Sequence, residues 1–409
     1  MTDSGTAQAM PPAVLVGLDS MQGLQVARLL TARGVDVTGV ATVRDHYATF
    51  TRICREIHYV DTGTDQLVDL LLDLARRLPM PAVLTGCQDK NVLVVSRRRD
   101  ELTEAGYRIR LPHDDVVRML SDKVTFADYA RKIGLAIPVS YRVDDREDLE
   151  MIAPTLPYPA VVKPPSRSGE WVKHTRAKAV RVESADELRS VYDLVEDWFS
   201  HLVVQQWVEG PESNLYSFNG CYDEQSQLLV SFIARKLRQY PPRVGQSAYG
   251  EEVRADAVLD ASHELFQSAG VVGLAYLEMK KDQRTGKFFA IEPNIGRPTG
   301  RSAIAEAGGV ALHYTAYCEA AGLPLPPLSE RTQRYGDARW IHVLRDTQTS
   351  IQYMREGELS VGGWLRSLRG RKAYAVLSAR DPMPFLAALW QGAKNAVGAG
   401  ETRKDTIAL

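Results

Sequence analysis

Cysteine is scarce in this chain, and long apolar runs are missing from it. Four cysteines are scattered among 409 residues, so the sequence indicates neither a disulfide framework nor a zinc site of paired cysteines. No apolar run approaches the length of about eighteen residues that a membrane-spanning helix needs, and residues 1–10 lack the basic and apolar segments of a secretory leader. We therefore expect a cytoplasmic protein with no membrane partner.

An excess of either charge is also missing. Lysine and arginine number 50 and acidic residues number 51, which leaves a formal net charge of −1. A nearly neutral chain lacks the overall positive field of a nucleic-acid-binding protein. We therefore expect no nucleic-acid partner, and the length of the chain suggests two to three domains.

The first hundred residues alternate short apolar strands with helices of apolar period. Strands are expected at residues 13–18, 35–40 and 82–85, with helices following each of them. This alternation predicts a doubly wound α/β domain. Its first turn contains Gly17 and Gly23 but lacks the Gly-x-Gly-x-x-Gly spacing, which disfavours a nicotinamide oxidoreductase.

From residue 112 the pattern becomes a mixture of helices and strands. Helices are expected at residues 114–133 and 185–199, and strands at 160–163, 202–206, 228–234, 274–280 and 288–292. The proline cluster at 324–327 indicates a boundary. The remainder is basic and is predicted to be helical, with three tryptophans as packing anchors, namely Trp340, Trp364 and Trp390.

Two strand-like runs, at residues 274–280 and 288–292, flank a polar turn and predict a β-hairpin. A loop centred on Thr285 places Glu278 opposite Glu292, with Asn294 on the same face. The other face would carry the packing residues Leu277, Met279, Phe289 and Ile291. Opposed carboxylates repel unless a cation lies between them, and such oxygen ligands suit Mg²⁺. The alternative is a pair of solvated residues on an exposed sheet face, and we favour the metal site.

Two arginines follow this hairpin, in the stretch from Gly296 to Ser302. Its glycines have three residues between them where a phosphate-binding P-loop has four and ends in lysine, so we reject a P-loop. Arg297 and Arg301 can still donate forked hydrogen bonds to a phosphoryl or carboxylate group. The alternative for either one is an ordinary surface arginine.

Two further segments could contact a nucleotide. Lys163 ends an apolar strand and is followed by the small, polar residues 166–170, which could fold over phosphate oxygens with their backbone amides. The strand at 202–206 breaks at Gly210 and presents Glu212 just beyond. Such an edge can offer backbone groups to adenine and a carboxylate to ribose. A lysine at a strand end is usually only solvated, and the second segment, read alone, is better explained as a strand-to-turn exit with a surface glutamate.

Taken together and in order, these elements resemble the ATP-grasp superfamily, and most closely its bacterial carboxylate–amine ligase branch. The resemblance rests on SDK around Lys123, VVKP around Lys163, SRSGEW, VVQQWVEGPE, ARKLRQYPP, LEMK and IEPN. It implies an α/β and α+β fold: a Rossmann-like pre-ATP-grasp domain at residues 1–112, a small ATP-grasp subdomain at 113–200, a large subdomain with the metal site at 201–327, and a helical C-terminal extension at 328–409.

The resemblance also implies a role for each matching residue. Phosphate contacts fall to Lys123 and Lys163, and the covering loop to Ser166, Ser168 and Gly169. Adenine would meet the backbone of Gln206 and Val208, beside Gln205, which replaces a frequent glutamate. The ribose would contact Glu212. The γ-phosphate would contact Lys236. The Mg²⁺ ligands would be Glu278, Glu292 and Asn294, with Arg297 or Arg301 at the acyl group.

The function that the resemblance implies is an enzyme, an ATP-dependent ligase that forms an amide through an acylphosphate and releases ADP and phosphate. Its cofactors would be ATP and Mg²⁺, with Mn²⁺ as an alternative, and its partners a small carboxylic acid and an amine or amino acid. The rival hypothesis is a regulatory protein that binds ATP without ligation. The C-terminal tail would pack on the ATP-grasp domain or form a homodimer contact.

Overall fold

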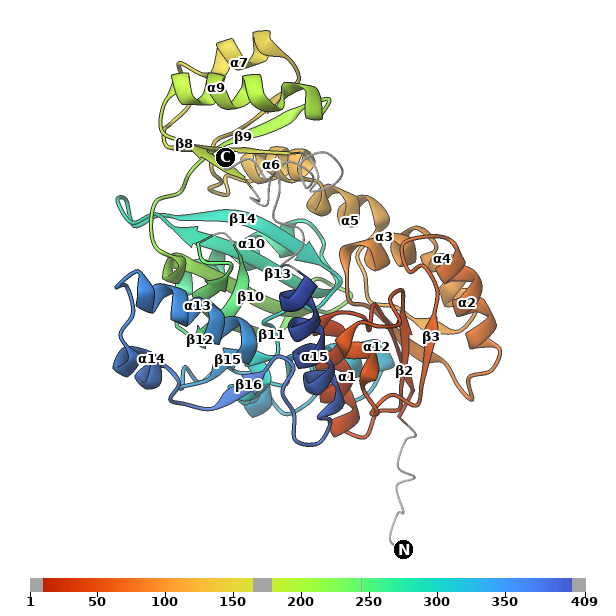
Figure 1. Cartoon of the computed structure of the whole chain (residues 1–409). Helices are drawn as coiled ribbons and strands as arrows, with labels where there is room; N and C mark the ends of the chain where they lie inside the picture. The colour runs from red at the N-terminus through yellow and green to blue at the C-terminus, as the bar shows by residue number, and fades with distance from the viewer. Residues whose placement is uncertain (1–9, 165–178, 244, 399–409) are drawn as a thin grey trace, which may run out of the picture.

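The computed structural model describes residues 10–164, 179–243 and 245–398. Three β-sheets of five, seven and four strands organise this part of the chain. The four-stranded sheet and its helices form a lobe that stands above a broader body made by the other two sheets (Figure 1).

The N-terminal sheet is parallel, in the order β3-β2-β1-β4-β5. Its strands are β1 (Ala13–Val16), β2 (Val37–Ala41), β3 (Glu56–Tyr59), β4 (Ala82–Gly86) and β5 (Tyr107–Arg108). Its helices are α1 (Met21–Ala32), α2 (Gln66–Ala75), α3 (Asp89–Arg97) and α4 (Arg99–Glu104). Every residue of β1 is buried, as expected for a parallel strand covered on both faces. The three strands predicted here are present, with ends that differ by up to two residues.

The single helix predicted after the N-terminal sheet is divided into two. Instead of one helix over residues 114–133, the chain forms α5 (Asp114–Ser121) and α6 (Lys123–Lys132). Asp122 separates them because its extended backbone ends α5 while its carboxylate accepts the amides of Val124 and Thr125, each at 3.0 Å. An aspartate in this position is a strong N-cap, and it places Lys123 in the first turn of α6.

The upper lobe contains the antiparallel sheet β6-β9-β7-β8. The strands are β6 (Ser140–Val143), β7 (Ala160–Lys163), β8 (Val180–Val182) and β9 (Leu202–Gln206). Helices α7 (Arg146–Ile152) and α9 (Ala185–Val195) cover its outer face (Figure 1). Leu149 and Leu188 of these helices are fully buried with Val204 of β9 in a separate core, so the lobe has its own apolar interior.

The seven-stranded sheet has the order β14-β13-β10-β11-β12-β15-β16. Its strands are β10 (Leu215–Tyr222), β11 (Leu228–Tyr240), β12 (Gln246–Glu252), β13 (Gly273–Lys281), β14 (Phe288–Ile295), β15 (Arg339–Ile341) and β16 (Lys372–Tyr374). Helix α10 (Asp256–Ser268) packs on it through Leu265 and Phe266. Two short helices, α11 (Ile304–Ala307) and α12 (Leu312–Ala321), follow β14.

The region after residue 327 contributes strands as well as helices. Beside α13 (Val343–Arg355), α14 (Val361–Ser367) and α15 (Met383–Gly398), it supplies β15 and β16, and β15 pairs with β12. Trp340 on β15 is fully buried, and its indole N–H donates to Gln25 of α1 at 2.9 Å. Trp390 was expected to be a packing anchor, but its side chain is 57% exposed.

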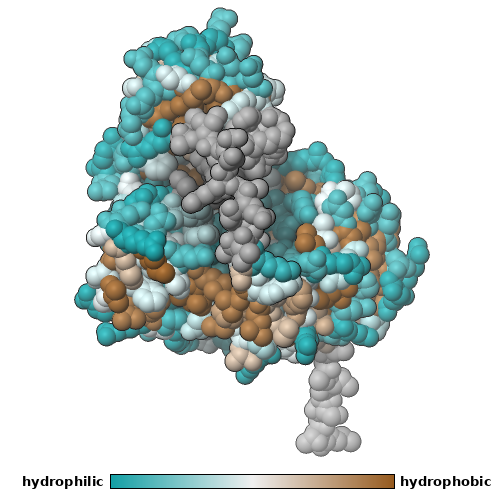
Figure 2. Space-filling view, viewed as in Figure 1, coloured by the Kyte–Doolittle hydropathy of each residue, from teal (hydrophilic) through white to brown (hydrophobic). Residues whose placement is uncertain are grey.

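Surface polarity differs between the two parts. Hydrophilic residues cover most of the upper lobe, whereas apolar residues gather over the centre of the lower body (Figure 2). Exposed apolar side chains of α15 include Leu386, Leu389 and Trp390. Over the described residues, no helix combines the length and the apolar character required to cross a membrane.

Candidate active site

A cavity of about 1040 Å³, called the central cavity below, lies between the upper lobe and the body. Residues of the α1, α3 and α6 N-termini, of β7 and β9, and of β11, β13 and β14 line it. Eleven predicted site residues meet there, namely Lys123, Lys163, Gln205, Gln206, Val208, Lys236, Glu278, Glu292, Asn294, Arg297 and Arg301. Glu212 lies just behind this lining, and Ser166, Ser168 and Gly169 lie outside the described residues.

The two predicted metal-binding carboxylates face each other. Glu278 of β13 pairs directly with Glu292 of β14 in the antiparallel register, as the hairpin argument predicted. Beyond this pair the register shifts by one residue, so Met279 pairs with Ala290. The prediction that Phe289 and Ile291 share the packing face was therefore wrong. Because of this bulge, Ala290 joins the core beside Met279, and Phe289 pairs with Lys280.

The two carboxylates have different surroundings. Glu278 binds the ammonium group of Lys236 at 2.7 Å and accepts the hydroxyl of Tyr276 at 3.2 Å. Burial raises its pKa, but the charge and hydrogen bond of Lys236 outweigh burial, so the pKa of Glu278 lies below its ordinary value. Glu292 lines the cavity and is accessible to solvent there, although protein surrounds it on its other sides. Burial and the charge of Glu278 raise the pKa of Glu292. Lys236 therefore balances the charge of Glu278, whereas no salt bridge among the described residues balances that of Glu292.

Asn294 and Arg297 are held together beside this pair. The amide oxygen of Asn294 accepts from the Arg297 guanidinium, which also binds both carboxylate oxygens of Asp89, at 2.5 and 2.9 Å. Asp89 begins α3 of the N-terminal sheet. Arg297 therefore links a predicted metal ligand to α3 beside the N-terminal sheet, and its forked donors are already engaged.

Arg301 differs from Arg297 in having a free donor. It is 4% exposed, and its two terminal nitrogens donate to Ser247 and Ser217, each at 2.8 Å, whereas its Nε has no partner in the structure. Gly250 lets it pass, because a Cβ there would lie 2.6 Å from Cδ of Arg301. The guanidinium thus brings a positive charge into the cavity wall, while its Nε is itself buried. No sequence motif pointed to Ser217, Ser247 or Gly250, since all three come from strands distant in the chain.

Lys163 ends β7 inside the cavity. Its ammonium group donates to the side-chain oxygen of Gln205 at 2.6 Å, and Gln205 in turn donates to Ser140 at 2.8 Å. Burial, followed by the positive charge of Lys123, lowers the pKa of Lys163 to about 8. Gln205 thus orients this lysine, a role that the sequence did not reveal.

Hydrogen bonds within the protein already occupy part of the strand edge that was predicted to meet adenine. The amide of Gln206 donates to the carbonyl of Val139 at 2.7 Å, and the amide of Trp207 donates to Pro159 at 2.9 Å. A base could therefore meet the backbone of Gln206 only through its carbonyl oxygen. Val208 is 4% exposed and still belongs to the cavity wall.

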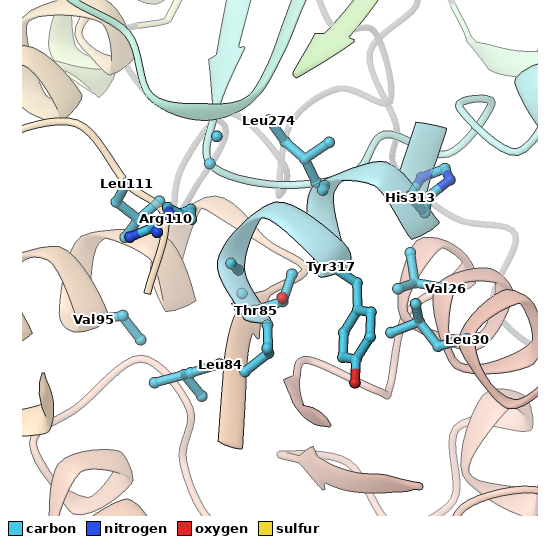
Figure 3. Close-up of a pocket in the computed structure, with 16 residues that line it drawn as sticks. Val26, Leu30, Leu84, Thr85, Val95, Arg110, Leu111, Leu274, His313 and Tyr317 are labelled. Atoms are coloured by element: carbon cyan, nitrogen blue, oxygen red, sulfur yellow. The ribbon is translucent and has the colours of Figure 1, made fainter. Parts of the chain in front are cut away.

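A second cavity, of about 40 Å³, lies between β4, α1 and α12 (Figure 3). Its walls are mainly apolar, as at Val26, Leu30 and Leu84, with His313 at one side. This volume has room for about one to three water molecules. His313 bonds Ser302 at 2.9 Å and Glu306 at 2.7 Å, so it ties the loop after Arg301 to α12. This cavity is too small for a substrate of the size that the central cavity admits.

No protein-family model matches this chain. Among curated proteins, it is 24% identical to D-aspartate ligase of Enterococcus faecium over 54% of each chain. It is 23% identical to the C-terminal section of carbamoyl phosphate synthase large chain of Methanopyrus kandleri over 52% of this chain, and 23% identical to D-alanine–D-alanine ligase B of Pseudomonas syringae over 42%. The chain spans about half or less of the length of these relatives, 39% to 54%.

Solved structures share the fold over most of the chain. An ADP complex of N5-carboxyaminoimidazole ribonucleotide synthetase matches 85% of this chain and 86% of its own, with a TM-score of 0.63 and 14% identity. The biotin carboxylase domain dimer of Hydrogenobacter thermophilus 2-oxoglutarate carboxylase, in complex with MgADP and bicarbonate, matches 80% of this chain and 73% of its own, with a TM-score of 0.61 and 16% identity.

These comparisons show which proteins the chain resembles. The mixed α/β architecture, with one parallel and two largely antiparallel sheets, matches that of ATP-grasp enzymes. The resemblance to the ATP-grasp superfamily that the motifs indicated is confirmed, and the relatives include ligases.

Proposed function

We propose that this protein is an ATP- and Mg²⁺-dependent ligase that joins a small carboxylic acid to an amine, with ADP and phosphate as products. One observation carries the proposal: the opposed carboxylates of Glu278 and Glu292 share one cavity with three predicted phosphate-binding lysines. The ligases among the relatives support the reaction class.

The residues at the hairpin fit a hard divalent cation. Glu278, Glu292 and Asn294 offer only oxygen atoms, which Mg²⁺ prefers, and Mn²⁺ accepts the same donors. This set has only two carboxylates, and nowhere in the described residues do three or more His, Cys, Asp or Glu side chains gather in a way that could hold a metal. Two carboxylates and one amide leave places for phosphate oxygens. Burial, followed by the charge of Glu278, raises the pKa of Glu292, and a bound cation would stabilise the charged form of this carboxylate. A bound Mg²⁺ would neutralise the phosphates.

Lysines would bind the phosphate chain from several elements. Lys123 and Lys163 would contact phosphate oxygens, with Ser166, Ser168 and Gly169 covering them, and Lys236 would contact the γ-phosphate. Adenine would lie against the carbonyl of Gln206 and against Val208, and ribose would reach Glu212. Phosphoryl transfer depends mainly on such positioning and on neutralisation of charge.

The proposed chemistry has two steps. A carboxylate oxygen of the acid attacks the γ-phosphorus and the bond to the β–γ bridging oxygen breaks, which gives an acylphosphate and ADP. The amine nitrogen then attacks the acyl carbon, phosphate leaves with the bonding pair, and the nitrogen loses a proton to solvent. The result is an amide. Of the two arginines, Arg301 is the better candidate to hold the acyl group, because it is paired only with serine hydroxyls, whereas Arg297 is engaged by Asp89.

In this proposal each predicted domain contributes to the site. Residues 1–112 form the Rossmann-like domain, whose α1 and α3 N-termini reach the cavity. Residues 113–200 and 201–327 form the small and large ATP-grasp subdomains. Residues 328–409 form the C-terminal extension, which packs on the large subdomain through β15 and α13.

A screen of pooled acids against pooled amines tests the proposal. The protein, ATP and Mg²⁺ are incubated with both pools, and mass spectrometry searches for an amide whose mass equals acid plus amine minus water. We expect one such product, formed together with ADP. ATP binding without any condensation product across a broad panel would instead support the non-ligating alternative.

The lowered pKa of Lys163 predicts a pH-dependent affinity for ATP. Lysine ordinarily titrates near pH 10.4, but the pKa of Lys163 in the free protein is about 8. Since only the ammonium form attracts phosphate, the affinity is expected to fall above pH 8, by up to about tenfold per pH unit. Calorimetric titration with ATP from pH 7 to 9.5 checks this. Lys163→Gln should bind more weakly and lose the dependence, and a flat wild-type profile would refute the assignment.

A further inference from the structure

One face of α13 carries a row of buried polar side chains. Asp346, Thr349 and Tyr353 are three and four residues apart, so they share one side of the helix. Asp346 and Thr349 are fully buried and Tyr353 is 8% exposed. Helix α13 packs on β11, the strand that carries Lys236 (Figure 1). Most polar groups buried at this depth have hydrogen-bond partners.

Each side chain of this row makes a hydrogen bond either to the C-terminal part of β11 or to Glu212 beside it. Asp346 pairs with both sides of the Arg238 guanidinium, at 2.6 and 3.2 Å. The hydroxyl of Thr349 donates to the carbonyl of Gln239 at 2.6 Å. The hydroxyl of Tyr353 donates to Oε1 of Glu212 at 2.6 Å. The row therefore ends on the carboxylate that the proposed function assigns to ribose.

Glu212 is held by three donors from two directions. Besides Tyr353, the backbone amide of Arg243 donates to Oε1, and the amide of Gln239 donates to Oε2 at 3.0 Å. A carboxylate accepts about four hydrogen bonds, so one acceptor position remains, on Oε2. Burial and Glu212 raise the pKa of Tyr353, which keeps the phenol a donor. The free position is one that a ligand hydroxyl can fill.

The segment that follows β11 and donates to Glu212 is also held by residues next to α13. Gln239 and Arg243 line the central cavity. The Arg243 guanidinium pairs with Glu356 at 2.7 Å and with Glu358 at 2.5 Å, both just beyond the end of α13. Helix α13 and the residues after it thus hold this segment as well as the carboxylate behind it.

We propose that Tyr353 is a positioning residue of the nucleotide site, which directs the free acceptor of Glu212 toward a ribose hydroxyl. The C-terminal extension thereby forms part of the nucleotide subsite although it contributes no group that touches the nucleotide. This inference rests on the proposed function, because it requires that ATP binds in the central cavity.

Comparison of ATP with 2′,3′-dideoxy-ATP separates positioning from a general structural role. Dissociation constants for both nucleotides are measured by calorimetry on the full chain, for wild type, Tyr353→Phe and Tyr374→Phe. The last variant is the matched control, since Tyr374 lies in the same region and is 42% exposed. We expect the wild type to bind ATP about tenfold more tightly than the dideoxy analogue.

For Tyr353→Phe we expect ATP affinity to fall about 3- to 10-fold, affinity for the dideoxy analogue to stay unchanged, and KM for ATP to rise with little change in kcat. Tyr374→Phe should match the wild type. Equal losses for both nucleotides, or no loss for either, would overturn the inference while leaving the proposed function standing. A wild-type protein that binds no adenine nucleotide would overturn the proposed function and this inference with it.

Discussion

Replacing Glu292 with glutamine is expected to slow phosphate release at least about 100-fold while the protein stays folded. The amide keeps the shape of the side chain but removes one of the two charges that would hold Mg²⁺ against the phosphates, and loss of one such electrostatic contact typically costs 10²–10³ in rate. The carboxylate is opposed by Glu278, and burial and that charge raise the pKa of Glu292. Its removal therefore relieves repulsion, and thermal stability should be equal or slightly higher.

The measurement is ADP release at saturating substrates, alongside thermal unfolding. Glu264→Gln, an equivalent change on the exposed side of α10, serves as the control and should leave the rate unaltered. Unimpaired turnover by Glu292→Gln would remove this residue from the metal site.

Replacing Asp346 with alanine is expected to lower the free energy of unfolding by about 3 to 5 kcal/mol. Asp346 is fully buried and neutralises Arg238, whose side chain is 7% exposed, and it also accepts the indole N–H of Trp364 at 3.0 Å. The substitution leaves a guanidinium charge in the interior without its partner, a much larger penalty than the pair itself contributes to stability.

Denaturant unfolding followed by circular dichroism gives this free energy. Asp186→Ala removes an aspartate of similar pairing, to Arg189, but with a side chain that is 94% exposed, and its effect should stay below about 1 kcal/mol. The double substitution Arg238→Met with Asp346→Leu should recover much of the loss. A stability of Asp346→Ala equal to that of the surface control would contradict the account of α13.

The sequence was most informative where local periodicity decides the structure. The pairing of Glu278 with Glu292 followed from strand alternation and a single turn, and the structure has this pair. The register shift beside it could not be predicted, because a bulge depends on how both faces pack, and it moved Phe289 away from the core side. The break at Asp122 did have a signal, since aspartate before a helical run is a preferred N-cap.

The sequence was silent where contacts join distant segments. Tyr353 and Glu212 are 141 positions apart, and Arg238 and Asp346 are 108 apart. Nothing in the local pattern around α13 names these partners. The strand β15 is also three residues long, and so short a run has no detectable alternation. The free Nε of Arg301 likewise depends on two serines that only the folded sheet brings beside it.

The products made from ATP provide the most direct test of the central claim. Phosphorus NMR follows ATP with the protein, Mg²⁺ and the pooled acids and amines, and in parallel samples that omit either pool. The account predicts ADP and inorganic phosphate when both pools are present and intact ATP when the acids are missing. AMP with pyrophosphate, or phosphate release that is equally fast without any acid, would contradict it.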